Sequence, residues 1–300
     1  YDIMTVGEAN GVPASDAEKW VGGEKRKFDM LFQFEHLDLW RPDPANRIDL
    51  PRVKEVFSRW QESLAGKGWN ALYLENHDIP RITSKWGDPA FWRESATCLA
   101  ALYFLQQGTP FIYQGQEIGM TNTVFQGPDD FDDVRARNLF SENRSKGVPD
   151  PDTVAALAPG SRDNARTPMQ WDSSPNGGFS SGTPWLKVNP NFRELNVASQ
   201  KGDPGSVLEF YRRLIALRKS HELFVYGSYE LLLPDHPQVY AYARTDGKMR
   251  AVVACNLSPH EAKLPAANWT GHPLLLANYY EPGHRSYLRP FETRVYEASS

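Results

Sequence analysis

Residues Ala71 to Arg81 read ALYLENHDIPR and carry the clearest signal for the fold. Four hydrophobic residues, typical of a buried strand, lead directly into the polar run Glu75–Asp78. In parallel βα folds the active site lies at the carboxyl ends of the strands. The stretch therefore predicts a parallel sheet with a polar site at its rim.

A second acid ends a similar run upstream, where the residues from Ile3 to Gly7 lead to Glu8. Parallel strands present their carboxyl ends at one edge, so we expect Glu8 and Asp78 at the same rim. Two such carboxyl groups suggest cleavage of a glycosidic bond, in which one acts as the acid and the other attacks or stabilises the charged sugar. A glutamate at the end of an apolar strand is expected to be partly desolvated, which suits Glu8 to the acid role.

Strand-like and helical patterns alternate in the first part of the chain, as in βα units. Strands are predicted at 3–8, 28–35, 69–74 and 109–113. Helices are predicted at 50–60 and 91–107. Four such strands amount to half of an eight-stranded barrel, which typically needs about 250 residues, or to a small open sheet.

A long segment, 121–204, is rich in Pro, Gly, Asn and Asp and shows no sustained period. Such a segment is usually an excursion over an active site, or else disordered. Four aromatic side chains in it favour order: Trp171, Phe179, Trp185 and Phe192. An amphipathic helix at 206–221 then closes the βα domain, which we predict to cover 1–221.

The last part of the chain, 222–300, changes to short strands separated by turns. These strands are predicted at 228–233, 238–244, 250–256, 273–278 and 291–297. Their spacing predicts a small antiparallel β-sandwich domain. No charged pair in it suggests catalysis, so we interpret the domain as structural.

Composition narrows the range of partners. The 300 residues carry 33 basic and 37 acidic side chains, a formal charge of -4, which favours neither nucleic acid nor an anionic membrane as partner. No run approaches the about 20 apolar residues of a membrane span. The start of the chain lacks the basic and apolar regions of a signal peptide. Cys98 and Cys255 lie in apolar runs far apart in the sequence, which indicates reduced core residues and a cytoplasmic location.

Metal binding is the competing interpretation of a cluster of His and Asp side chains. No His-x-x-x-His or Cys-x-x-Cys spacing is present, and the acidic run Asp129–Asp133 lacks the glycine and final glutamate of a calcium loop. We interpret that run as a solvated loop. Neither a metal nor another cofactor is expected.

Four motifs together resemble glycoside hydrolase family 13, the α-amylase superfamily. Met4–Glu8 and Glu75–Arg81 look like its third and fourth signature regions. YQGQEIGM at 113–120 and SRDNARTPMQW at 161–171 resemble the oligo-1,6-glucosidase and α-glucosidase branch. The resemblance covers the whole chain. It implies the α/β class: the C-terminal half of a (β/α)8 TIM barrel, strands five to eight, followed by the β-sandwich.

The resemblance also implies roles for individual residues. Glu8 would be the general acid/base, and Asp78 would be the carboxylate that steadies the transition state through sugar hydroxyls. His77 would help to hold the sugar ring at the cleavage subsite.

Four further side chains would shape the pocket. Arg166 looks like the arginine that closes the blind end of an exo-acting pocket, and Arg162 is the second candidate for that role. Glu117 and Asn10 would line the leaving-group side. The implied activity is that of a retaining α-glucosidase acting at the non-reducing end of short oligosaccharides.

One feature of the family is missing. Its nucleophile is an aspartate in a Gly-Phe-Arg-x-Asp context, which does not occur here. The resemblance places it upstream of Tyr1, together with any structural calcium site. We therefore expect the N-terminal half of the same enzyme as a partner, and we predict that residues 1–300 alone are inactive.

Three alternatives remain. A sucrose isomerase or another transglucosidylase would share the same acid and stabiliser, although Ser58–Ser63 lacks the Arg-Leu-Asp-Arg-Asp run of isomerising relatives. A non-enzymatic relative, the heavy chain of amino-acid transporters, would tolerate loss of Glu8 and Asp78, and both are present. The preferred linkage stays undetermined, because one of its main determinants lies beside the nucleophile.

Overall fold

The computed structural model describes residues 3–24, 26–43, 47–265, 269–281 and 283–298. Its contacts divide the chain into two compact units. Unit 1 comprises Tyr1–Leu74, Trp86–Phe111 and Phe210–Ser300, and unit 2 comprises Glu75–Lys85 and Ile112–Glu209. The domain boundary expected at 221/222 therefore stays a prediction.

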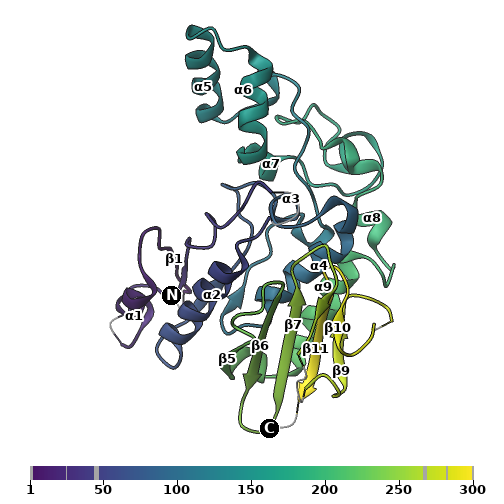
Figure 1. Cartoon of the computed structure of the whole chain (residues 1–300). Helices are drawn as coiled ribbons and strands as arrows, with labels where there is room; N and C mark the ends of the chain where they lie inside the picture. The colour runs from purple at the N-terminus through teal and green to yellow at the C-terminus, as the bar shows by residue number, and fades with distance from the viewer. Residues whose placement is uncertain (1–2, 25, 44–46, 266–268, 282, 299–300) are drawn as a thin grey trace. The chain divides into compact units, whose positions relative to one another are not determined.

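Figure 1 labels most of the regular elements. The helices are α1 (Glu18–Val21), α2 (Leu50–Leu64), α3 (Ile82–Lys85), α4 (Trp92–Phe104), α5 (Val134–Ser145), α6 (Asp150–Leu157), α7 (Asp163–Arg166), α8 (Val197–Gln200), α9 (Val207–Ser220) and α10 (Leu223–Tyr226). The strands are β1 (Val6–Glu8), β2 (Met30–Phe32), β3 (Asn70–Leu72), β4 (Thr109–Pro110), β5 (Ser228–Leu232), β6 (Val239–Thr245), β7 (Arg250–Asn256), β8 (Ala262–Lys263), β9 (Leu274–Ala277), β10 (Tyr287–Leu288) and β11 (Thr293–Ala298).

Unit 1 contains a parallel sheet in the order β1-β2-β3-β4. All four predicted strands are confirmed, but each is shorter than predicted. β1 begins later and ends at Glu8 as predicted, whereas the last residues predicted for β2, β3 and β4 belong to the following loops. The register pairs Glu8 with Phe32, so Glu8 is the last residue of its strand. Polar residues thus follow the strands at the carboxyl edge, as the sequence predicts.

Helix α2 confirms the helix predicted at 50–60 and extends it to Leu64. It begins where the Asp49 side chain accepts a hydrogen bond from the backbone of Arg52, with Pro51 in the first turn, where its missing N–H costs nothing. Val56, Trp60 and Leu64 pack in one cluster with Leu31 of β2. The apolar face of α2 therefore covers the parallel sheet.

The C-terminal part of unit 1 forms a five-stranded antiparallel sheet, β5-β6-β7-β11-β9, and a two-stranded one, β10-β8. Ala262 and Leu288 of the small sheet share a core with Val252 and Ala254 of β7. This arrangement confirms the predicted sandwich. The strands β8 and β10 were not predicted, because two residues are too short to show an alternating pattern.

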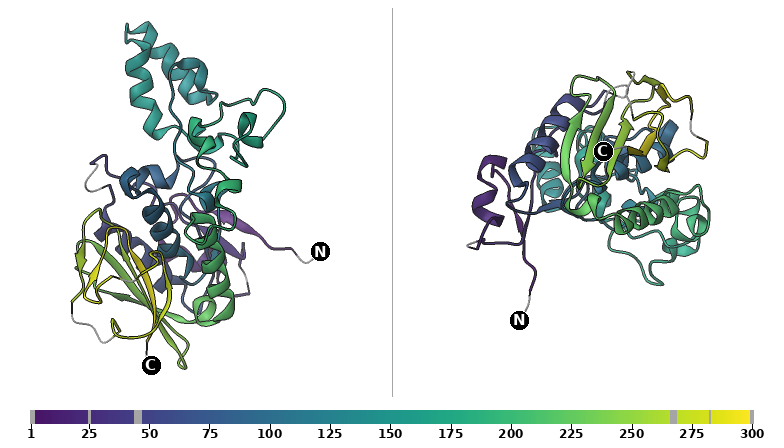
Figure 2. Two further views of the ribbon diagram at one scale, coloured as in Figure 1. Left: turned by 90° about the vertical axis from the view of Figure 1, so that its right-hand side faces the viewer. Right: turned by 90° about the horizontal axis from the view of Figure 1, so that it is seen from below.

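Helix α4 lies beside the larger sheet in both Figures 1 and 2. Ten of its 13 residues are buried, so it is covered on nearly all sides. Cys98 of α4 and Cys255 of β7 are both free and buried, as predicted. The fold brings them to the same place, where the Thr293 hydroxyl lies 2.8 Å from Cys255 Sγ and 3.7 Å from Cys98 Sγ.

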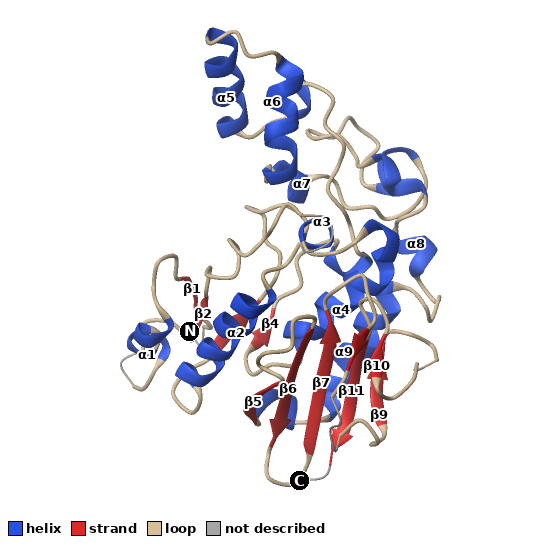
Figure 3. Cartoon of the chain, in the orientation of Figure 1, coloured by secondary structure: helices blue, strands red, loops and turns tan. Residues whose placement is uncertain are grey.

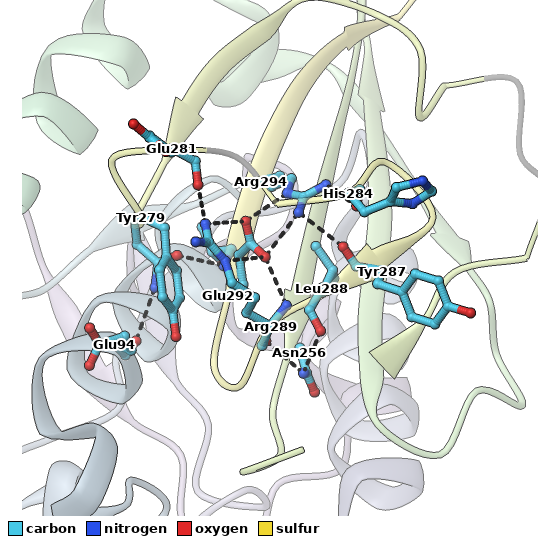
Figure 4. Close-up of polar contacts among 12 residues, drawn as sticks. Glu94, Asn256, Tyr279, Glu281, His284, Tyr287, Leu288, Arg289, Glu292 and Arg294 are labelled. Carbon is cyan, nitrogen blue, oxygen red and sulfur yellow. Dashed lines mark hydrogen bonds and ion pairs between the residues drawn. The ribbon is translucent and has the colours of Figure 1, made fainter. Parts of the chain in front are cut away.

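A buried ion pair stabilises the end of the same sheet (Figure 4). The Arg294 guanidinium donates two hydrogen bonds to the Glu292 carboxylate, at 2.8 and 2.9 Å, and Arg289 donates further ones. Burial works against the charge of Glu292, but these hydrogen bonds outweigh it and lower its pKa. Since every charged group in the cluster has a partner, the cluster is structural.

Unit 2 is mostly loop, as the tan segments of Figure 3 show. It also contains helices α5 and α6, which the expectation of an irregular 121–204 missed. The reason is that α5 buries only Ala136 and Phe140 and is otherwise polar, so its helical period is weak. The core beside it contains three phenylalanines, Phe125, Phe131 and Phe140, together with Ala136 of α5 and Val154 of α6.

The four aromatic residues that were expected to order this segment do not form a common core. Trp171, Phe179 and Trp185 are exposed. The segment is ordered instead by the phenylalanine core and by hydrogen bonds to its loops.

Candidate active site

Asp78 lies in a tight turn that follows β3. Asn76 Oδ1 accepts a hydrogen bond from the backbone N–H of Asp78 at 2.8 Å, and this closes the turn. His77 Nε2 lies 3.5 Å from Asp78 Oδ2, and both side chains are about half exposed. The polar run thus presents a carboxylate and an imidazole to solvent, as the sequence predicts.

Two arginines bind the Asp78 carboxylate. Arg166 donates to Asp78 Oδ1 at 2.7 Å and to the backbone carbonyl of His77 at 2.9 Å. Arg162 reaches the same oxygen at 3.3 Å. Four of the predicted site residues, Asp78, His77, Arg162 and Arg166, therefore lie together in unit 2. Two guanidinium groups at one carboxylate fix its orientation.

Asp133 belongs to this cluster, although the sequence did not indicate it. Its carboxylate accepts two hydrogen bonds from Arg162, at 2.6 and 2.8 Å, and one from the backbone of Arg135 at the start of α5. Burial has the largest single effect and opposes its charge, but the hydrogen bonds from Arg162 and Arg135 and the nearby positive charges together outweigh it and lower the pKa of Asp133. The interpretation of Asp129–Asp133 as a solvated loop is therefore wrong for Asp133, which is 8% exposed, because this residue pairs with Arg162.

Asp163 holds Asp133 in place from behind. It is fully buried, and its Oδ2 accepts hydrogen bonds from the backbone N–H groups of Asp132 and Asp133, both at 2.9 Å. A chain of contacts therefore leads from Asp163 through Asp133 and Arg162 to Asp78. The only signal in the sequence for this chain of contacts was the density of charged residues in the 161–171 motif.

Arg81 ties together the three segments that carry the site. It is fully buried, and it donates to the Glu75 carboxylate at 3.3 Å and to the backbone carbonyls of Gln114 at 2.7 Å and Ala165 at 3.2 Å. In the sequence, Glu75 lies close to Asp78, Gln114 lies close to Glu117, and Ala165 directly precedes Arg166. Arg81 therefore sets the spacing of these three segments within unit 2.

Glu117 sits on the turn that Arg81 supports. Its Oε2 accepts a hydrogen bond from the backbone N–H of Gly115 at 2.8 Å, and burial raises the pKa of Glu117. Gly115 has φ of +88°, and a Cβ there would lie 2.3 Å from Met120 Sδ. Only glycine fits this turn without strain.

Glu8 and Asn10 belong to unit 1 and are exposed at the carboxyl end of β1. The partial desolvation expected for Glu8 is not found in this chain, because β1 is an outer strand of its sheet. One buried group lies near it: burial, and then the negative charge of Glu8, raise the pKa of Tyr73.

Within the described ranges, no group of three or more His, Cys, Asp or Glu side chains is placed to hold a metal ion. In that same part of the chain, no helix is long and apolar enough to cross a membrane.

Comparison with known proteins gives two family matches. The family described as "Alpha amylase, catalytic domain" matches residues 1–227, and "Maltogenic Amylase, C-terminal domain" matches residues 229–277. Among curated proteins, the chain is 44% identical to the probable oligo-1,6-glucosidase 3 of Bacillus subtilis and 45% identical to the oligo-1,6-glucosidase of Halalkalibacterium halodurans. Each alignment covers 99% of this chain but 55% of the relative, so the chain spans about half the length of these proteins.

Solved structures also resemble the chain. Trehalose-6-phosphate hydrolase of Bacillus licheniformis has a TM-score of 0.90 at 35% identity. Isomaltulose synthase of Erwinia rhapontici, in complex with its natural substrate sucrose, has a TM-score of 0.88 at 37% identity. Both comparisons cover 99% of this chain and 56% of the solved one.

Proposed function

Because the chain belongs to the alpha-amylase catalytic-domain family, we propose that it forms the C-terminal part of a retaining α-glucosidase. The enzyme removes glucosyl units from the non-reducing end of short oligosaccharides. The observation that carries this proposal is the Asp78 carboxylate held by Arg162 and Arg166. A carboxylate held in a fixed orientation suits the recognition of sugar hydroxyls. The names of the curated relatives, mostly oligo-1,6-glucosidases, support the same substrate class.

In the proposed reaction, the Glu8 carboxyl group donates its proton to the glycosidic oxygen as the bond to the sugar breaks. An aspartate outside residues 1–300 attacks the anomeric carbon and forms the glycosyl-enzyme. Glu8, now a carboxylate, takes a proton from the water that releases the sugar. Asp78 binds hydroxyls of the same sugar and, by its charge, stabilises the positive transition state.

The other site residues position the substrate. His77 and Arg166 hold the sugar ring and close the pocket behind it, with Arg162 in support. Glu117 and Asn10 contact the leaving group. None of these steps needs a metal or another cofactor, and we propose that the enzyme acts in the cytoplasm.

The partner in this proposal is the N-terminal half of the same barrel. The sheet described here ends in the outer strands β1 and β4, and strand edges of a parallel sheet are normally covered. The missing half would pair with both. We therefore propose that residues 1–300 alone do not hydrolyse glycosides, and hydrolysis by this chain in isolation would refute that part of the proposal.

The test compares two substrates that share a glucosyl group, isomaltose and p-nitrophenyl α-glucoside, in the protein supplied with the first half of the barrel. Glu8→Gln is expected to lower kcat much more on isomaltose, whose leaving group needs a proton, than on the activated glucoside. Asp78→Asn should lower kcat on both. Glu230→Gln, which changes an exposed glutamate of β5, is the matched control. Equal losses on both substrates would rule out Glu8 as the acid.

A second function of the same family is isomerisation of sucrose. It is favoured by the solved structures named trehalulose synthase and isomaltulose synthase. Product analysis on sucrose distinguishes the two functions: a hydrolase releases glucose and fructose, whereas an isomerase releases a new disaccharide.

A further inference from the structure

A groove lies in unit 2, with a volume of about 420 Å³. One wall is formed by residues 129–132 and the other by residues 183–188. Its described lining includes none of the residues assigned to cleavage. The volume falls in the range of about 300–1,000 Å³ that is typical of small-ligand sites.

The most prominent feature of this groove is the Trp185 side chain, which lines it and is 63% exposed. An indole has a large apolar face with one polar N–H at its edge. Exposing that face to water is unfavourable, and a ligand with one apolar face removes the cost. A sugar ring has such a face, formed by its axial C–H groups.

The charged side chains of the groove indicate the charge of the ligand that it can bind. Lys187 pairs with Asp130 at 2.6 Å, and Arg137 pairs with Asp132. Asp129 adds a third, exposed carboxylate. Because three acids face two cations, the groove has no surplus positive charge for a phosphate or another anion. Carboxylates and cations side by side suit a neutral ligand with many hydroxyl groups, each of which both donates and accepts.

The wall that carries Trp185 is well supported. The Asn176 carboxamide, which also lines the groove, donates to the carbonyls of Ser180 at 3.0 Å and Gly182 at 2.9 Å, and so holds the turn that leads to Trp185. On the opposite wall, Phe131 stacks on Phe125 with ring centroids 4.2 Å apart. Both walls exist before a ligand binds, which lowers the cost of ordering them on binding.

We propose that the Trp185 groove is a second saccharide-binding site, which takes one or two glucosyl units of a neutral oligosaccharide. The sugar stacks on the Trp185 indole, and Asp129 and Arg137 bind its hydroxyls. The identity of the sugar rests on the proposed α-glucosidase function. The groove itself takes part in no bond cleavage.

The test measures binding of isomaltotriose and maltotriose by calorimetry to the protein assembled with the first half of the barrel. All variants carry Asp78→Asn so that the ligand is not consumed. Trp185→Ala is expected to weaken binding at one class of sites by about tenfold, because it removes the stacking surface. Trp185→Phe should keep most of the affinity. Phe179→Ala, which changes another exposed aromatic residue of unit 2 outside the groove lining, is the control and should bind like the parent.

Kinetics separate this proposal from the proposed function. With Asp78 restored, Trp185→Ala should leave kcat on p-nitrophenyl α-glucoside unchanged. If no glycoside is hydrolysed but Trp185-dependent binding is measured, only the hydrolase proposal fails. Equal affinities of Trp185→Ala and Phe179→Ala, or no binding of either trisaccharide, would overturn the second site. Because Trp185 is exposed, loss of folding is not expected, and a melting curve checks this.

Discussion

Replacing Arg81 by methionine removes the cation of a fully buried ion pair while keeping much of the side-chain volume. The partner, Glu75, is buried as well, and the two groups lie 3.3 Å apart. Breaking such a pair typically costs about 3–5 kcal/mol, because the remaining charge is left without a partner. The carbonyl of Ala165 keeps two other donors, Tyr113 and Gln114, so we expect a loss near the lower limit, about 3 kcal/mol.

The loss should depend on pH. Burial raises the pKa of Glu75, and the positive charge of Arg81 opposes this rise. Without Arg81 the pKa rises further. A carboxyl group whose pKa is higher in the folded than in the unfolded state stabilises the fold at low pH and loses that contribution as the pH rises. The stability deficit of Arg81→Met should therefore be larger at about pH 8 than at about pH 5.

Activity gives the second measurement. Arg81 spaces the segments of Asp78, Glu117 and Arg166, so Arg81→Met should lower kcat/KM by about a hundredfold even where the variant is folded. This kcat/KM is measured on p-nitrophenyl α-glucoside with the protein assembled with the first half of the barrel. Adding Glu75→Gln removes the stranded charge and keeps an acceptor for the backbone N–H of Ile82, which donates to Glu75 Oε1 at 2.7 Å in the parent. This double variant should regain stability but not activity.

The matched control is Glu292→Gln, which breaks a comparable buried pair, that of Glu292 with Arg294 (Figure 4), outside the predicted site. It should lose similar stability, measured by urea unfolding at both pH values, and keep kcat/KM where it is folded. The reasoning is refuted if Arg81→Met unfolds at the same urea concentration as the parent, or if the double variant recovers full activity.

Three further changes have defined outcomes. Asp133→Asn keeps the cap of α5 but weakens the hydrogen bonds that hold Arg162. We therefore expect kcat/KM to fall by about tenfold while the circular dichroism spectrum stays unchanged. An unaltered kcat/KM would exclude Asp133 from the site. Gly115→Ala forces a Cβ against Met120 and should cost about 2 kcal/mol, visible as a lower Tm; an equal Tm would contradict the crowding. Burial lowers the pKa of Lys54 to about 8. Between about pH 8 and pH 10 the unfolded chain therefore keeps a proton that the folded protein has released, so the free energy of unfolding should rise with pH, and Lys54→Met should remove that rise.

Much of the fold follows from local patterns. The strands that end at Glu8 and before Glu75 show as hydrophobic runs that lead into polar residues, and α2 shows as an apolar stripe. These patterns are clear because burial of one face, or of a whole element, requires hydrophobic residues at regular positions in the sequence. Helix α5 escaped prediction because it is largely exposed, and exposure leaves little pattern in a sequence.

The parallel and antiparallel sheets and the family motifs could be predicted from the sequence. The resemblance to the family also pointed to four residues that lie together in the fold: Asp78, His77, Arg162 and Arg166. Three features became visible only in the folded chain: Asp133 is buried against Arg162, Arg81 joins three segments, and Trp185 lines a groove. The physical reason is the distance along the chain. Asp78 and Arg166 lie 88 residues apart, and Asp133 and Arg162 lie 29 apart. Hydrophobic periodicity reports only which face of one element is buried, whereas a charged pair forms wherever the folded chain brings its two members together.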